Sequence, residues 1–148
     1  MLREAHAIWK DGPYAGEGAL STASGLLNNT KYTFGSVTGL MGFTSPAEML
    51  AAAIASSMSR MIALEMAKVG ITPVQVETNA VLKIDFVGEA LRIVSAQLRI
   101  NARTNNAESD RFEEAVESAR QECPIASILN VDIQCEAKLL AAPVPALV

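Results

Sequence analysis

Between residues 74 and 102, hydrophobic and polar positions alternate along the chain. The apolar side of the first run holds Val74, Val76, Thr78, Ala80, Leu82, Ile84 and Phe86. After Gly88 and Glu89 a second run alternates in the same way, and its apolar side holds Val94, Ala96, Leu98, Ile100 and Ala102. A period of two residues is that of a β-strand with one buried face. The pattern therefore predicts a long β-hairpin with one face toward the core and one toward water.

A long helix is predicted between Thr44 and Gly70. Ser45 and Glu48 have the spacing of a capping box, in which each side chain bonds the backbone amide of the other, and Pro46 suits the first helical position. Gly70 is typical of a residue that ends a helix. The residues between these signals are apolar or small on nearly every side, which predicts burial on most faces of the helix.

The same apolar helix raises the question of a membrane span. Arg60 and Glu65 interrupt the helix, and no stretch of about 18 uncharged apolar residues remains, as a membrane-spanning helix would need. We therefore expect a core helix that other parts of the protein cover, and no membrane partner.

Weaker patterns predict the remaining elements. Three strands are expected before the long helix, at residues 6–10, at 16–24 and around 32–38. A second helix begins at Ser109 or Asp110, and its apolar stripe consists of Phe112, Ala115, Val116 and Ala119. A short third helix is expected from Cys123 to Leu129 and a last strand at residues 131–140. This order, βββ-α-ββ-αα-β, predicts an α+β fold in a single domain of residues 1–148, with a largely antiparallel sheet and helices on one face.

Composition narrows the choice of partners. Hydrophobic residues make up 50% of the chain and charged residues only 19%, and this apolar surplus favours a buried subunit interface. The net charge of −4 argues against binding to nucleic acid or to an anionic membrane. The first residues lack a secretory apolar run, and two cysteines without a regular framework favour a reducing compartment. We expect a cytoplasmic protein.

Two kinds of site are disfavoured by the placement of residues. Ser57 lies within the predicted helix instead of on a Gly-x-Ser-x-Gly elbow, and the only histidine, His6, is on the first predicted strand. A serine hydrolase is therefore disfavoured. One histidine and two scattered cysteines, Cys123 and Cys135, give no metal-ligand spacing. We expect no metal and no cofactor.

Several short motifs occur in an order that resembles a known family. They are Thr-Ser-Pro-Ala-Glu at residues 44–48, Gly-Ile-Thr-Pro at 70–73 and Glu-Cys-Pro-Ile at 122–125, preceded by Trp9, Gly16-x-Gly18 and Leu27-Asn28. Together with the long hairpin they cover nearly the whole chain and resemble the OsmC/Ohr family of thiol-dependent peroxidases. The resemblance implies an OsmC-like fold and an intertwined homodimer, with two long helices buried back to back and active sites at the interface.

The resemblance also implies a reaction and its residues. Family members reduce organic hydroperoxides with a reactive cysteine, which becomes a sulfenic acid and is then resolved to a disulfide by a second cysteine; a dithiol reductant is the partner that this cycle implies. At the family's positions this chain has Ser57 for the attacking cysteine and Cys123 for the second cysteine. Glu48 occupies the position of a family glutamate that holds an arginine, so this glutamate is retained. Val37 occupies the position of that arginine, so the arginine is replaced.

The serine leads to a first hypothesis. A serine hydroxyl has no sulfenic state, so Ser57 cannot carry out the oxidation step. The chain is then a diverged OsmC-like protein whose interface pocket, with Ser57, Val37 and Ile54, suits a small apolar or weakly polar ligand. A deliberately exchanged cysteine would be another origin of Ser57, although one designed change would not account for Val37.

A second hypothesis keeps hydroperoxide reduction, with Cys123 as the sole redox thiol and Arg60 as the cation. Cys123 stands at an expected helix N-terminus, where the helix dipole favours a thiolate. Plainer roles exist for the same residues: a buried packing thiol for Cys123, a carboxylate partner across the dimer for Arg60, and helix capping for Glu48. Cys135 is expected to be a packing residue. The sequence therefore leaves enzyme activity open.

Overall fold

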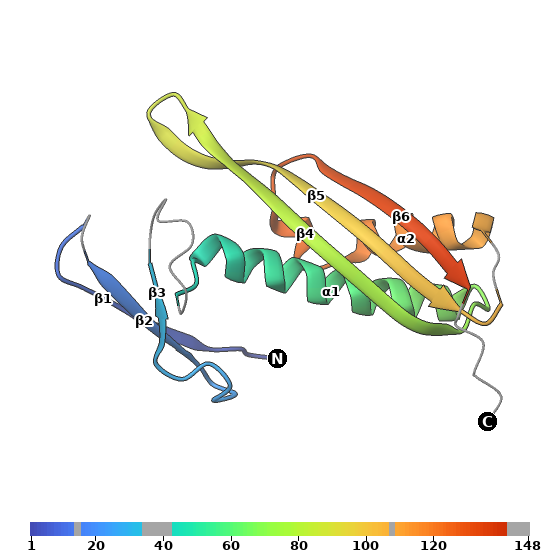
Figure 1. Ribbon diagram of the computed structural model, residues 1–148, viewed down its shortest axis with the longest axis horizontal. Helices are drawn as coiled ribbons and strands as arrows, with labels where there is room; N and C mark the ends of the chain where they lie inside the picture. The colour runs from blue at the N-terminus through green and yellow to red at the C-terminus, as the bar shows by residue number, and fades with distance from the viewer. Residues whose placement is uncertain (14–15, 34–42, 107–108, 142–148) are drawn as a thin grey trace. The chain divides into compact units, whose positions relative to one another are not determined.

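Figure 1 shows the computed structural model of the chain, which describes residues 1–13, 16–33, 43–106 and 109–141. The chain divides into two compact units, Met1–Leu50 and Ala51–Val148, each with a sheet of its own. The elements follow in the predicted order: three strands, a long helix, a hairpin, a second helix, a short helical turn and a last strand. This order confirms the α+β fold class, while a single domain of residues 1–148 stays a prediction.

The first unit is built on a three-stranded antiparallel sheet. Its strands are β1 (Ala5–Lys10), β2 (Glu17–Thr22) and β3 (Thr30–Tyr32), in that order. Trp9 packs on Tyr32 with ring centroids 5.8 Å apart, and its Nε1 donates a hydrogen bond to the Gly12 carbonyl at 2.7 Å. Gly18 lies directly under the Tyr32 ring, so that a Cβ at this position would overlap the ring unless the ring moved. The first two predicted strands are confirmed, and most of the third, expected around 32–38, lies outside the described residues.

Helix α1 (Pro46–Lys68) begins and ends at the predicted signals. The Ser45 amide donates a hydrogen bond to the Glu48 carboxylate at 2.9 Å, and the Glu48 amide donates one to Ser45 Oγ at 3.2 Å. These reciprocal bonds satisfy amides that the helix itself leaves without partners. After the helix, Gly70 adopts a φ of 82°, which is more costly for residues with a Cβ. The predicted cap and stop are confirmed.

One side of α1 is buried within the chain. Its buried residues are Ile54, Met58, Ile62, Glu65 and Met66, whereas Ala52, Ser56, Arg60 and Leu64 on the other side are exposed. Burial on most faces, as predicted, is therefore not reached within a single chain, because one sheet and one further helix cover only one side. By length and composition α1 is also apolar enough to cross a membrane, a property that it shares with the core helices of soluble proteins.

The second unit contains a mixed three-stranded sheet. Its strands are β4 (Pro73–Val87), β5 (Ala90–Thr104) and β6 (Ile133–Ala141), in that order. β4 and β5 form the predicted antiparallel hairpin, whereas β6 pairs with β5 in parallel. The parallel pairing, which the sequence pattern did not predict, follows from the connection: helix α2 (Ser109–Glu122) and the 3-10 turn η1 (Ala126–Ile128) carry the chain back before β6 begins. Figure 1 shows α1 and α2 on one side of this sheet.

Two bulges alter the predicted faces of the hairpin. Val74 and Val94 have no partner on the opposite strand, and Val74 is 53% exposed, so its predicted place on the apolar face is wrong. The other predicted core positions of β5 are buried: Ala96, Leu98, Ile100 and Ala102. The predicted stripe of α2, Phe112, Ala115, Val116 and Ala119, is buried as well. The core of the second unit thus lies between the helices and one face of the sheet.

Candidate functional site

Two of the predicted site residues meet at the end of α2. Cys123 Sγ donates a hydrogen bond to Ser57 Oγ of α1 at 3.2 Å, although the two residues are 66 positions apart in the sequence. Cys123 is fully buried and Ser57 is half-buried. The fold therefore brings together the two positions that the resemblance assigns to the attacking and the resolving thiol.

The local backbone explains how Cys123 is held. The predicted helix from Cys123 to Leu129 is shorter than expected, since only the 3-10 turn η1 forms there. The Ala126 amide donates a hydrogen bond to Cys123 Sγ at 3.5 Å, and the Ser127 amide donates one to the Cys123 carbonyl at 3.0 Å. The thiol thus accepts a bond from the backbone and donates one to a hydroxyl. Neither of these two partners of the thiol carries a charge.

Ser57 and Cys123 form an oxygen–sulfur pair, and this limits their chemistry. A disulfide needs two sulfur atoms about 2.05 Å apart, and Ser57 supplies an oxygen. The second thiol of the chain, Cys135, lies on β6, and both cysteines are free. Burial raises the pKa of the half-buried Cys135 thiol, while the nearby Arg120 guanidinium acts in the opposite direction. Raised in this way, the pKa of Cys135 favours the protonated thiol.

The other predicted site residues are placed less tightly. Glu48 is exposed and accepts hydrogen bonds from Thr44 and Ser45, so its visible role is helix capping. Ile54 is buried one turn before Ser57 on α1. Arg60 is exposed, and its side chain makes no ion pair with the residues that the structure describes. Val37 lies outside the described residues.

A second polar contact joins the two helices, and the sequence pattern did not reveal it. Glu65 of α1 is only 5% exposed; it accepts a hydrogen bond from Lys68 Nζ at 2.6 Å and another from Ser118 Oγ of α2 at 3.1 Å. The Lys68 hydrogen bond, with help from Ser118, holds the pKa of Glu65 below its ordinary value although burial acts against this. The signal in the sequence was a carboxylate three residues before a lysine within an otherwise apolar helix.

Replacing Glu65 by glutamine is expected to lower the free energy of unfolding most at neutral pH. Because its folded-state pKa is depressed below the ordinary 4.5, the carboxylate stabilises the protein fully above that value and loses this effect as the pH falls through the folded-state pKa. In urea titrations from neutral pH to about pH 3, the difference between wild type and Glu65→Gln should therefore shrink. Glu114→Gln, at an exposed position of α2, is the matched control. A difference for Glu65→Gln that stays constant with pH would contradict this assignment.

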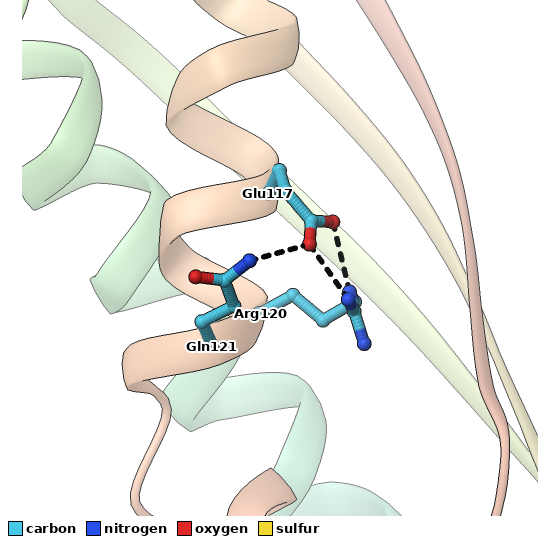
Figure 2. Close-up of polar contacts among 3 residues, drawn as sticks. All are labelled: Glu117, Arg120 and Gln121. Atoms are coloured by element: carbon cyan, nitrogen blue, oxygen red, sulfur yellow. Dashed lines mark hydrogen bonds and ion pairs between the residues drawn. The ribbon is translucent and has the colours of Figure 1, made fainter.

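The outer side of α2 carries a further ionic cluster (Figure 2). Arg120 donates two hydrogen bonds to the Glu117 carboxylate, at 2.9 and 2.6 Å, and Gln121 donates a third at 2.8 Å. These bonds lower the pKa of Glu117 to about 2. Both ionic partners are partly exposed, so the pair stabilises the last turns of α2 only modestly. The Arg120 guanidinium is thus bound to a carboxylate of its own helix.

Neither a metal site nor the predicted pocket is evident in the described part of the chain. No group of three or more His, Cys, Asp or Glu side chains is placed to hold a metal ion among the described residues. A surface hollow in the first unit is lined by residues 2–5 and 22–24, none of which was predicted for the site. The chemistry of the candidate site therefore rests on the Ser57–Cys123 pair.

A long capped helix that carries Ser57, followed by a long hairpin that bonds this helix through Thr78, is the arrangement of the OsmC class of proteins. Residues 39–138, more than half of the chain, match the family described as OsmC-like protein, and the chain belongs to that family. It is 28% identical to Peroxiredoxin OsmC of Escherichia coli over 138 residues, which cover 93% of this chain and 96% of the relative. The resemblance inferred from the motifs is confirmed.

Solved structures support the same fold. An OsmC-like protein of unknown function from Vibrio cholerae superposes with a TM-score of 0.77 at 15% identity, covering 93% of this chain and 99% of its own. The organic hydroperoxide resistance protein OhrB of Bacillus subtilis superposes with a TM-score of 0.65 at 19% identity, covering 93% and 98%. The OsmC-like fold is thereby confirmed.

Proposed function

We propose that this protein is a diverged member of the peroxiredoxin-like OsmC family, without a two-cysteine peroxidase cycle, which binds a small apolar or weakly polar molecule beside Ser57 and Cys123. The observation that carries the proposal is the 3.2 Å contact between Cys123 Sγ and Ser57 Oγ. In the cycle that the family resemblance implies, the cysteine at the first of these positions is oxidised to a sulfenic acid, and the cysteine at the second then converts it to a disulfide. An oxygen at one of them blocks both steps.

The surroundings of the pair support the loss of the cycle. A reactive thiolate needs a nearby cation or a comparable electropositive group. The Cys123 thiol donates a hydrogen bond to the Ser57 hydroxyl and accepts one from the Ala126 backbone amide, and neither group carries a charge. Arg60, the cation that the second hypothesis needs, is exposed on α1. Hydroperoxide reduction by Cys123 alone therefore has less support.

The same surroundings indicate the class of ligand. Ile54 and Met58, next to Ser57 on α1, are fully buried and apolar, and the pair itself offers only one hydroxyl and one thiol. If a ligand binds beside the pair, a neutral molecule with at most one or two hydrogen-bonding groups would suit these neighbours better than an anion. We place this site in a cytoplasmic homodimer, in which a second chain covers the side of α1 that a single chain leaves exposed.

The test is reduction of cumene hydroperoxide with a dithiol reductant by wild type, Cys123→Ser and Cys135→Ser. We expect all three to stay at the uncatalysed rate, because no pair of thiols can close the cycle. Turnover that disappears in Cys123→Ser but persists in Cys135→Ser would instead establish a one-cysteine peroxidase.

Ligand binding is measured on the same samples with cumyl alcohol as an unreactive probe, which is expected to raise the Tm of wild type.

A further inference from the structure

Two side-chain hydrogen bonds connect α1 with α2 and the residue that follows it. Cys123 Sγ donates one to Ser57 Oγ at 3.2 Å, and about two turns further along α1 the Glu65 carboxylate accepts one from Ser118 Oγ at 3.1 Å. As α1 runs from Ser57 to Glu65, its partners run back from Cys123 to Ser118, so the two helices are antiparallel. The contact at Glu65 therefore bears on where the end of α2 lies against α1.

The Glu65 carboxylate is bound at both of its oxygens. Lys68 Nζ donates to Oε1 at 2.6 Å and Ser118 Oγ donates to Oε2, while Glu65 itself is only 5% exposed. Lys68 belongs to the same helix as Glu65 and orients the carboxylate from α1, whereas Ser118 reaches it from α2. A shift of α2 would leave a buried, charged oxygen without its partner, which costs more than the hydrogen bond itself contributes.

The residues of α2 beside Ser118 are small. Ala115 and Ala119 are buried and offer only methyl groups to the core. Apolar contacts of this kind are not directional, so they resist a shift of one helix along the other less than a hydrogen bond between fixed groups does. Buried polar pairs are known to set the register of packed helices in this way.

Another polar contact lies at the far end of α2. Arg111 Nη1 donates a hydrogen bond to the Val69 carbonyl at 3.3 Å, and this contact is exposed. Exposed hydrogen bonds exchange readily with water and contribute little net free energy. Ser118, in contrast, stands about one and a half turns before Cys123, and α2 is continuous between them as far as Glu122. The position of Ser118 is thus transmitted to Cys123.

We propose that Glu65 is a positioning residue for the Ser57–Cys123 pair: by binding Ser118 it fixes the position of α2 along α1 and keeps Cys123 Sγ within reach of Ser57 Oγ. The proposal rests on the site of the proposed function and adds a residue that does not touch the pair. Without the Glu65–Ser118 contact, the distance between the sulfur and the oxygen should vary more widely, beyond any loss of stability.

The experiment measures how readily a disulfide forms between Cys123 and the thiol introduced by Ser57→Cys, in a chain that also carries Cys135→Ser. The disulfide reports position, because it forms only where two sulfur atoms reach about 2.05 Å. The protein is equilibrated with glutathione; its two thiols are oxidised while one glutathione disulfide is reduced to two thiols. We expect Ser118→Ala to lower the equilibrium constant about tenfold, which is about 30 mV for this two-electron couple.

A second substitution and two controls sharpen the test. Glu65→Ala should give the same decrease as Ser118→Ala, and the two together no more than either alone, because both remove one contact. Ser118→Thr keeps the hydroxyl, and Glu117→Gln removes a carboxylate that bonds within α2; both should stay within about twofold of the parent. A purely structural role of Glu65 would destabilise the reduced and oxidised proteins equally and leave the constant unchanged.

The outcomes separate this proposal from the proposed function. A constant that is unchanged by both Ser118→Ala and Glu65→Ala overturns the positioning role, whatever happens to the Tm. Failure of the disulfide to form while the Glu65–Ser118 contact is intact also overturns it, because the contact then does not hold the pair within bonding reach. Hydroperoxide turnover by wild type, or no binding of cumyl alcohol, would instead overturn the proposed function and leave these constants as they are.

Discussion

Replacing Ser57 by cysteine is expected to give a protein that forms a disulfide with Cys123 when an organic hydroperoxide is added. The new thiol would take the distal oxygen of the hydroperoxide, leaving an alcohol and a sulfenic acid. The Cys123 thiol would then attack the sulfenic sulfur, which forms the disulfide and releases water. Since Ser57 Oγ is already 3.2 Å from Cys123 Sγ, a longer carbon–sulfur bond and a small rotation bring two sulfur atoms within bonding reach.

The disulfide should lower the number of free thiols and also raise the stability of the protein. It would close a loop across the 66 positions between the two residues, and such a link is expected to raise the free energy of unfolding by about 2–4 kcal/mol over the reduced variant. The measurements are thiol counts before and after hydroperoxide, and urea titrations of both forms. With a dithiol reductant the variant is expected to turn over, and more rapidly once Val37→Arg supplies a cation.

Ser57→Ala is the matched control for this experiment. It removes the hydroxyl without adding a thiol, so its stability should not respond to hydroperoxide. A Ser57→Cys protein that keeps both new and old thiols free after oxidation would mean that the two side chains cannot adopt disulfide geometry. In that case the site has diverged in its backbone as well as in its chemistry.

Most of the fold could be predicted because its signals are local. The capping box of Ser45 and Glu48, the stop at Gly70 and the alternation along β5 each depend on residues that are neighbours in sequence. The bulges at Val74 and Val94 were not predictable in this way, because an unpaired residue is defined by the opposite strand. The parallel pairing of β6 also depends on the path of the chain through α2, which a strand's own alternation does not encode.

The candidate site was predictable only in part. The family resemblance assigned Ser57 and Cys123 to the two thiol positions, but their contact was not predicted, since nothing local links a helix position to a residue 66 positions later. The buried carboxylate of Glu65 was missed for a physical reason: Lys68 follows three residues later, and such a pair is usually a solvated one on a helix surface. Its burial is visible only once α2 brings Ser118 onto the same carboxylate.

Truncating Ile100 to alanine is expected to destabilise the protein by about 2–5 kcal/mol, the range for large apolar side chains removed from a packed core. Ile100 is 1% exposed on β5, the central strand of the second sheet. Its neighbour Asn101 is exposed on the opposite face of the same strand. Asn101→Ala should therefore change the free energy of unfolding by no more than about 0.5 kcal/mol.

The comparison of these two variants tests the strand register itself. A shift by one residue would exchange the faces of β5 and move the larger cost from Ile100 to Asn101. Urea titrations of both variants, made in parallel with wild type, give the two differences directly. Equal costs at the two positions would mean that both faces of the sheet are covered, and the polar face of β5 would then have to be part of an interface that a single chain does not show.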